Sequence, residues 1–283
     1  MPPGESWLSF VPGAHELAHW IESFGRSWLF GHPVHVQHIF SIILVAIVMA
    51  LLSLTASRQL ASAGQDILPE ERLSARTIVE LLFEGLLTIM QFAMPFEAAV
   101  KHFRFIGTLF FFILFSNLLG LIPGFVPPTE SFNTTFALSS IVFVYYNAYA
   151  LYQLGFAHLT HMANPVGEWW GWFLAPIFFP IELVSHCIRP VSLAVRLMCN
   201  ISGDHIVMAV FLGIFPFVLP IPFLGLGTFV ALVQTFVFTL LSSVYIGEVE
   251  AMIAAHHAHD HAHAHDHAHA DAHEPSASHG LAR

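Results

Sequence analysis

Arg196 is the residue that best indicates the chemistry of this chain. It lies inside the strongly apolar stretch PVSLAVRLMCNISGDHIVM. An arginine near the centre of a lipid bilayer costs about 2.5 to 3.5 kcal/mol on insertion scales, so it needs a partner or contact with water. Two interpretations are open at this point: a structural ion pair with Glu182 or Asp204, or a charge on a path for ions.

Helical spacing places polar residues on the same side as Arg196. At about 100° per residue, Glu182, Ser192 and Asn200 fall within about 40° of the arginine. Asp204 lies about 80° round the helix, and the next residue, His205, is on the opposite side. Along the axis, the two acidic residues are about 21 Å and 12 Å from Arg196. These separations do not suit one tight ion pair, and they favour two polar routes that meet at the arginine.

Two amide side chains lie alone in apolar stretches. Gln234 interrupts the run LVQTFVFTLLSSVY, and Asn117 lies among phenylalanine and leucine residues. Taken alone, each is explained by a hydrogen bond to a neighbouring helix, which is the ordinary use of an amide inside a membrane.

The composition places these residues in a membrane protein. Of the 283 residues, 56% are hydrophobic and only 10% are charged, against about 25% charged in ordinary soluble domains. Several apolar runs reach the roughly 20 residues that a transmembrane helix needs. The nine lysines and arginines argue against nucleic-acid binding. No Walker-type nucleotide loop is present, so we do not expect this chain to be an enzyme that makes ATP itself.

The apolar runs predict an all-α integral membrane protein. About five transmembrane helices are expected, near residues 38–57, 103–122, 133–155, 172–212 and 223–252. Residues 77–95 carry Glu80 and Glu84 on one face, a pattern that favours an amphipathic interfacial helix, with a span as the alternative. The 172–212 run is unusually long and contains three prolines, so we expect it to be kinked.

The distribution of positive charge predicts the topology. Five of the nine lysines and arginines lie between the first two clear spans, namely Arg58, Arg72, Arg76, Lys101 and Arg104. The positive-inside rule places that segment in the cytoplasm. We therefore predict an extracytoplasmic segment over residues 1–37, a membrane domain over 38–252, and a cytoplasmic tail over 253–283. The first segment shows no cleavable signal peptide.

The tail is histidine-rich and of low complexity. Ten of the 20 histidines follow Ala254, in alternation with alanine and aspartate. Such a composition cannot build a packed core, so disorder is expected. The alternation gives no fixed ligand geometry, and we predict no metal site.

Three segments, in the right order, resemble one family. RPVSLAVRLMCNISGD resembles the signature of F-type ATP synthase subunit a, in which PVSL-x-x-R-L-x-x-N is diagnostic. LVQTFVFTLLSSVYIGE resembles the last helix of that family, and SNLLGLIPG resembles the end of its third helix. The resemblance covers roughly residues 75–252. It implies a stationary proton-channel subunit in a bacterial inner membrane, without a cofactor. The implied partners are a ring of c subunits, b-type peripheral-stalk subunits and the bilayer. The resemblance further implies that the last two helices are strongly tilted along the ring.

The resemblance also implies roles for the polar residues. Arg196 would favour the ionised form of a ring carboxyl and keep two proton routes apart. The implied outer route contains Asp204, His205, Asn117 and Gln234, and the inner route contains Glu182 and His186. Asn200 and Ser192 flank the arginine by one turn on either side. Many members carry histidine or glutamate where this chain has Gly227, and His205 would then supply the missing imidazole.

Two other classes of function are open. An ion channel or secondary transporter would often show internal repeats, and none is visible here. A non-catalytic membrane anchor would tolerate neutralisation of Arg196, which makes the two interpretations of that residue testable.

Overall fold

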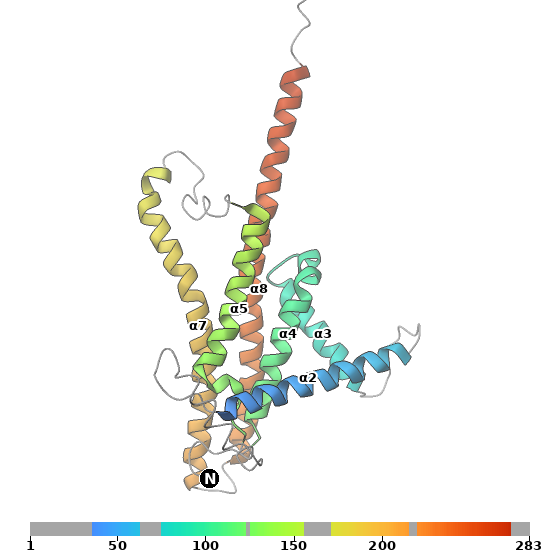
Figure 1. Cartoon of the computed structure of the whole chain (residues 1–283), viewed down its shortest axis with the longest axis vertical. Helices are drawn as coiled ribbons and strands as arrows, with labels where there is room; N and C mark the ends of the chain where they lie inside the picture. The colour runs from blue at the N-terminus through green and yellow to red at the C-terminus, as the bar shows by residue number, and fades with distance from the viewer. Residues whose placement is uncertain (1–35, 63–74, 123–124, 156–170, 215–219, 273–283) are drawn as a thin grey trace, which may run out of the picture.

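The computed structural model describes residues 36–62, 75–122, 125–155, 171–214 and 220–272. All regular structure in these ranges is helical (Figure 1). The elements are α2 (Val36–Ser62), α3 (Ala75–Gln91), α4 (Phe96–Gly120), the short 3-10 helix η2 (Pro128–Glu130), α5 (Phe132–Leu154), α7 (Gly171–Ile214) and α8 (Pro220–Ala272). The predicted all-α class is therefore confirmed.

Four of the described helices are long and apolar enough to cross a membrane. Their candidate spans are His38–Thr55, Phe96–Gly120, Pro176–Phe211 and Ile221–Ala258. The returning span expected over 133–155 corresponds to α5, which has 23 residues and a length of about 35 Å. That length exceeds the roughly 30 Å hydrocarbon core, but α5 contains asparagine, threonine, serine and tyrosine residues and is not among the candidate spans of the described helices. Its crossing of the membrane stays a prediction.

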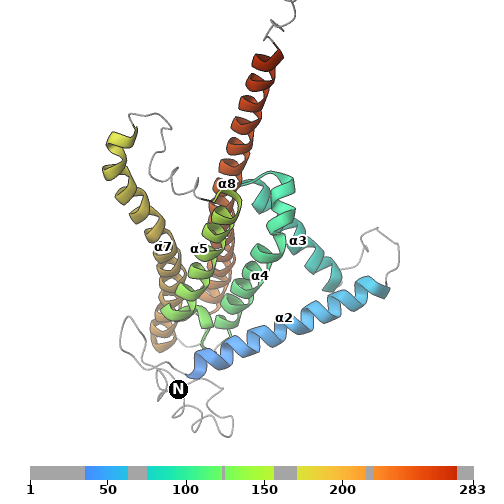
Figure 2. The same ribbon diagram turned by 45° about the horizontal axis from the view of Figure 1, so that its top comes forward.

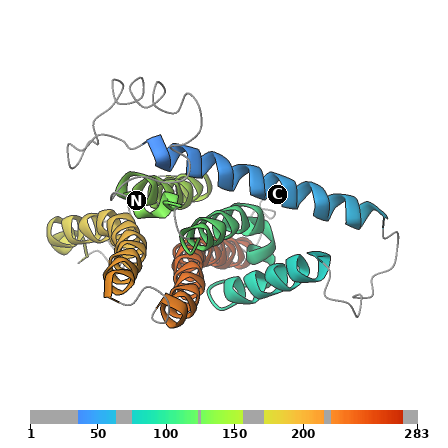
Figure 3. The same cartoon turned by 90° about the horizontal axis from the view of Figure 1, so that it is seen from below.

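The middle of the bundle is formed by α4 and α5. Seen from below, they lie between α2 on one side and α7 with α8 on the other (Figure 3). Side chains from four helices are completely or almost completely buried there: Ile113, Tyr146, Leu197 and Phe238 are at most 1% exposed. α2 crosses the bundle at the end where η2 lies (Figure 1), and the Ser41 hydroxyl donates a hydrogen bond to the Val126 carbonyl over 2.7 Å.

α3 and α4 form a helical hairpin (Figure 2). Leu86 and Met90 of α3 are fully buried in the shared core. Residues 92–94 turn the chain, and Pro95 precedes the first residue of α4, where its missing N–H costs nothing. α3 has 17 residues, about 26 Å in length, and is not among the candidate spans of the described helices. Its interfacial position stays a prediction.

α7 is one continuous helix of 44 residues that contains Pro176, Pro180 and Pro190, as the sequence predicts. Its first half curves away from α5 (Figure 2). That half contains all three prolines, each of which removes a backbone hydrogen-bond donor and so favours a bend. At about 66 Å, α7 is roughly twice the thickness of a hydrocarbon core.

α8 is longer than the sequence indicates. It continues through the histidine-rich segment to Ala272, 53 residues in all, and projects beyond the rest of the bundle (Figure 1). The composition favoured disorder from residue 253, and over residues 253–272 the structure differs. Alanine is the best helix former, and no proline follows Pro222 until Pro275, so nothing ends the helix at the bundle. Residues 273–283 and 1–35 lie outside the described residues.

Candidate functional site: the polar seam between α7 and α8

One stripe of α7 faces α8 and carries Arg189, Arg196 and Asn200. The Arg189 guanidinium contacts both carboxylate oxygens of Glu248, at 2.6 and 3.4 Å, and lies 5.0 Å from the ring centre of Tyr245. Asn200 donates a hydrogen bond to the Gln234 side-chain oxygen over 2.5 Å. Arg196 therefore lies on α7 between two polar contacts that join this helix to α8.

Arg196 itself is exposed. Within the described part of the chain, it makes no ion pair with Glu182 or Asp204. The structural ion pair considered from the sequence is thus not what these residues form. The stretch of α8 between Gln234 and Glu248 carries no carboxylate, so α8 does not offer one opposite the arginine either.

The surface around Arg196 is apolar. On α7, Ile188 is 57% and Val195 is 39% exposed, and on α8, Phe236 is 41% exposed. Lipid or a partner of similar character must cover these side chains, because large contiguous apolar surface is not left in water. The charge of Arg196 consequently lies at the border of a membrane-facing surface.

Asn117 is the centre of a buried hydrogen-bond cluster at the end of the bundle near η2. Its amide nitrogen donates to the Ala231 carbonyl over 3.4 Å and to the Thr235 hydroxyl over 3.3 Å. Its oxygen accepts from the Thr129 hydroxyl over 2.9 Å. The cluster therefore joins α4, α8 and η2. This is the hydrogen bond to a neighbouring helix that was expected for a lone amide in an apolar stretch. Gln234, next to Thr235, is 3% exposed.

His205 lies at the same end and is held at both ring nitrogens. Nδ1 is 3.1 Å from a carboxylate oxygen of Glu130, and Nε2 is 3.1 Å from the Gly120 carbonyl oxygen. Asp204, the acidic neighbour named from the sequence, makes no hydrogen bond or ion pair with a described residue. Glu130 was missed as a site residue, because nothing local in the loop indicates contact with a helix 75 residues later.

The opposite end of the seam holds the other predicted pair. His186 Nε2 is 3.2 Å from a Glu182 carboxylate oxygen, one helical turn away. The Tyr146 hydroxyl of α5 lies 3.3 Å from Nδ1 of the same imidazole. Ser192 is exposed between this pair and Arg196. The structure thus separates two groups of predicted residues, one on each side of the arginine.

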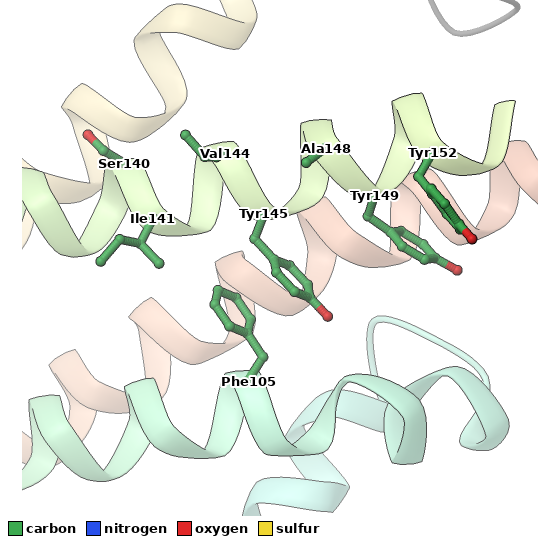
Figure 4. A pocket seen from close by; sticks show the side chains of 8 residues that line it. All are labelled: Phe105, Ser140, Ile141, Val144, Tyr145, Ala148, Tyr149 and Tyr152. Carbon is green, nitrogen blue, oxygen red and sulfur yellow. The ribbon is translucent and has the colours of Figure 1, made fainter. Parts of the chain in front are cut away.

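A second polar cluster was not foreseen from the sequence. One carboxylate oxygen of Glu250 lies 2.9 Å from His102 Nε2, 3.3 Å from Lys101 Nζ and 2.7 Å from the Tyr149 hydroxyl. The His102 Nδ1 is 2.8 Å from the Tyr145 hydroxyl. Both tyrosines line a groove between α4 and α5, where Figure 4 shows Phe105 facing Tyr145. This Glu250 cluster joins α4, α5 and α8.

Beside the Glu250 cluster, α8 meets the turn between α3 and α4 at very close range. A Cβ added to Gly247 would lie 2.3 Å from the Ala93 carbonyl oxygen. Only glycine therefore allows this approach of helix to backbone. Among the described residues, no group of three or more metal-ligating side chains is arranged to hold an ion.

The fold and this seam define a multi-pass, all-α membrane protein with a charged residue beside a membrane-facing surface. Residues 38–247 match the family described as ATP synthase A chain, and the chain belongs to that family. It is 36% identical over 264 residues to an ATP synthase subunit a of Sorangium cellulosum, covering 91% of this chain and 100% of the relative. It is 39% identical over 259 residues to an ATP synthase subunit a of Bdellovibrio bacteriovorus, covering 90% and 99%. A Campylobacter jejuni subsp. doylei relative of the same description is 36% identical over 238 residues, covering 81% and 98%.

Proposed function

We propose that this chain is the stationary proton-channel subunit of a rotary F-type ATP synthase and is itself non-catalytic. Its partners are then a ring of c subunits, b-type peripheral-stalk subunits and the lipid of a bacterial inner membrane. In this assignment the η2 end of the bundle faces outward and the C-terminus lies in the cytoplasm, as the positive charges predict.

The observation that carries this proposal is that Arg196 is exposed and has no ion-pair partner among the described residues. A guanidinium group in apolar surroundings needs an anion beside it. The described parts of α7 and α8 place no carboxylate next to Arg196. A carboxyl group on a ring helix that moves past the α7–α8 surface would supply that anion. Arg196 would favour the ionised form of the carboxyl while it faces the seam.

The two polar groups on either side of Arg196 suit two offset proton routes. Toward η2 lie Asn200, Gln234, Asn117, Asp204 and His205. Toward the other end lie Ser192, Glu182 and His186. The buried Gln234 amide nitrogen and Ser116 hydroxyl have no hydrogen-bond partner among the residues that the structure describes. Such groups cost about 1 to 3 kcal/mol when they stay dry, so they favour a hydrated route at the η2 end.

Separation of the routes by Arg196 prevents a proton from passing directly between them. Each proton must then travel on the ring, and it releases about 2.3 kcal/mol per 100 mV of membrane potential. The ring converts this free energy into rotation.

ATP-driven proton pumping in inverted vesicles tests the assignment. We expect Arg196→Ala to abolish pumping while the complex still assembles, and Arg196→Lys to leave little, because a lysine is a shorter, more strongly hydrated charge. Arg104→Ala is the matched control, since Arg104 is an exposed arginine of α4 on a different helix from the seam; its pumping should equal that of wild type.

Pumping by an assembled Arg196→Ala complex would contradict the proposal and favour a membrane anchor. Ion flux through the isolated chain, without ring subunits, would instead favour an ion channel or transporter.

A further inference from the structure

The contacts of His205 restrict where its protons can be. The Gly120 carbonyl oxygen, 3.1 Å from Nε2, is only an acceptor. The hydrogen bond therefore needs a proton on Nε2. In the neutral ring Nδ1 then carries no proton, and it faces the Glu130 carboxylate oxygen at 3.1 Å.

A second proton is required for that remaining contact. Neutral Nδ1 and an ionised carboxylate oxygen are both acceptors and repel each other at this distance. The contact becomes favourable when one proton lies between them, either on the imidazole opposite a carboxylate or on the carboxyl opposite a neutral imidazole. In both cases the pair has no net charge, which suits a site beside an apolar bundle.

We propose that Glu130 and His205 share a single transferable proton and form the first proton-holding station of the outer route. The proposal rests on the proposed function and adds a residue to it, since Glu130 supplies from η2 the carboxylate that accompanies the imidazole. Release of the shared proton toward Arg196 leaves two facing acceptors, and a proton from the outer side restores the contact.

The position of η2 suits this role. Glu130 and His205 side chains are 31% and 29% exposed, so the pair is not sealed inside the bundle. Thr129, the preceding residue, binds Asn117, and Asn117 binds Thr235 next to Gln234. One short helix thus holds both the proton station and the amide cluster that leads along the seam. Asp204, adjacent to His205, is the acidic residue that α7 itself carries on this part of the helix.

The structure also shows why His205 fits here. A Cβ on Gly120 would lie 3.3 Å from His205 Nε2 and 2.9 Å from a ring carbon of Pro127. Glycine at this position therefore lets the imidazole approach the backbone carbonyl while η2 packs over it.

Glu130→Gln separates proton transfer from structure. The glutamine amide can donate a hydrogen bond to Nδ1, so the contact and the Nε2–Gly120 bond are both kept, but no proton is transferable. We would measure passive proton conduction through the membrane sector after removal of the catalytic sector, in vesicles with equal amounts of assembled complex. Glu97→Gln, the same change at an exposed position of α4, is the matched control.

We expect Glu130→Gln to lower conduction by about 100-fold, the low end of what a positioned proton-transfer group contributes, and Glu97→Gln to conduct normally. Wild-type conduction in Glu130→Gln overturns the proposal and leaves Glu130 a structural contact. If Glu130→Gln does not assemble, Glu130→Asp decides the question. The aspartate side chain is one methylene shorter, so its carboxylate lies farther from His205. Reduced conduction in this variant supports the proposal, and wild-type conduction overturns it.

ATP-driven pumping by Arg196→Ala, measured in vesicles that keep the catalytic sector, distinguishes this proposal from the proposed function. Loss of pumping in Arg196→Ala together with wild-type conduction in Glu130→Gln rejects the proton station alone. Retained pumping in Arg196→Ala rejects the proposed function.

Discussion

The two ends of the bundle around Arg196 are held together by different chemistry. At the η2 end, amides, hydroxyls and one histidine–glutamate contact join α4, α7, α8 and η2. At the Glu250 end, α8 is joined to α7 by the Arg189–Glu248 ion pair and to α4 by the Glu250 cluster. The ion pairs at the Glu250 end join the helices through opposite charges, whereas hydroxyls and amides exchange partners at small cost.

This difference indicates that the two ends have different roles. Under the proposed function, the Glu250 end holds α8 in place and the η2 end conducts protons. Damage at the Glu250 end should therefore lower assembly, whereas damage at the η2 end should lower conduction in complexes that still assemble. Three substitutions test that contrast.

The largest effect is expected for Gly247→Ala. Its new Cβ would lie 2.3 Å from the Ala93 carbonyl oxygen, and because backbone meets backbone, α8 must move away from the α3–α4 turn. We expect the free energy of unfolding to fall by at least about 3 kcal/mol, the upper end of what ordinary overpacking costs. The amount of assembled complex and its thermal inactivation midpoint in detergent measure this. Gly225→Ala, with open space around it, should assemble normally, and equal behaviour of the two variants would show that the close approach does not matter.

Glu250→Gln should have the next largest effect. The change removes the charge that accepts hydrogen bonds from Lys101, His102 and Tyr149, and His102 is only 2% exposed. Leaving buried donors poorly paired costs about 1 to 3 kcal/mol, so the thermal midpoint should fall. Glu248→Gln should lower the thermal midpoint less than Glu250→Gln does, since the Glu248 side chain is 45% exposed against 16% for Glu250. A larger loss in Glu248→Gln would mean that the Arg189 contact, not the Glu250 cluster, holds α8.

The smallest effect on assembly is expected for Gly120→Ala. The added methyl group meets Pro127 at 2.9 Å and His205 at 3.3 Å, so the imidazole and η2 must shift by a few tenths of an ångström. We expect normal assembly with passive proton conduction reduced by about tenfold, since a small misplacement of a proton-transfer group already lowers the rate. Gly203→Ala, which has open space on α7, provides the control. Impaired assembly with normal conduction would reverse the contrast between the two ends.

The helices and the stripe around Arg196 could be predicted because their signals are local. Long apolar runs, the prolines of α7 and the spacing of Arg196 and Asn200 each depend on residues within a few turns. Glu130, Lys101, His102 and Glu250 could not be predicted as partners, since each of their contacts joins residues that are 75 to 149 positions apart. Such pairs depend on how helices pack, which hydropathy does not encode.

The histidine-rich segment shows a different kind of failure. Its low-complexity composition pointed to disorder, but alternating alanines support a helix, and a helix already formed by α8 needs no new nucleus to extend. The start of the segment at residue 253 is therefore not a structural boundary, and Pro275 is the first residue that would oppose continuation.

The unbroken length of α8 makes its far end a lever arm. From Glu250 to Ala272 the helix extends about 33 Å past the cluster that anchors it, and it projects free of the other described helices (Figure 1). A rigid rod of this length turns a tilt of about 5° at the anchor into a displacement of about 3 Å at its tip. A reporter attached near Ala272 would consequently register small movements of α8 at the seam as readily measured changes in position.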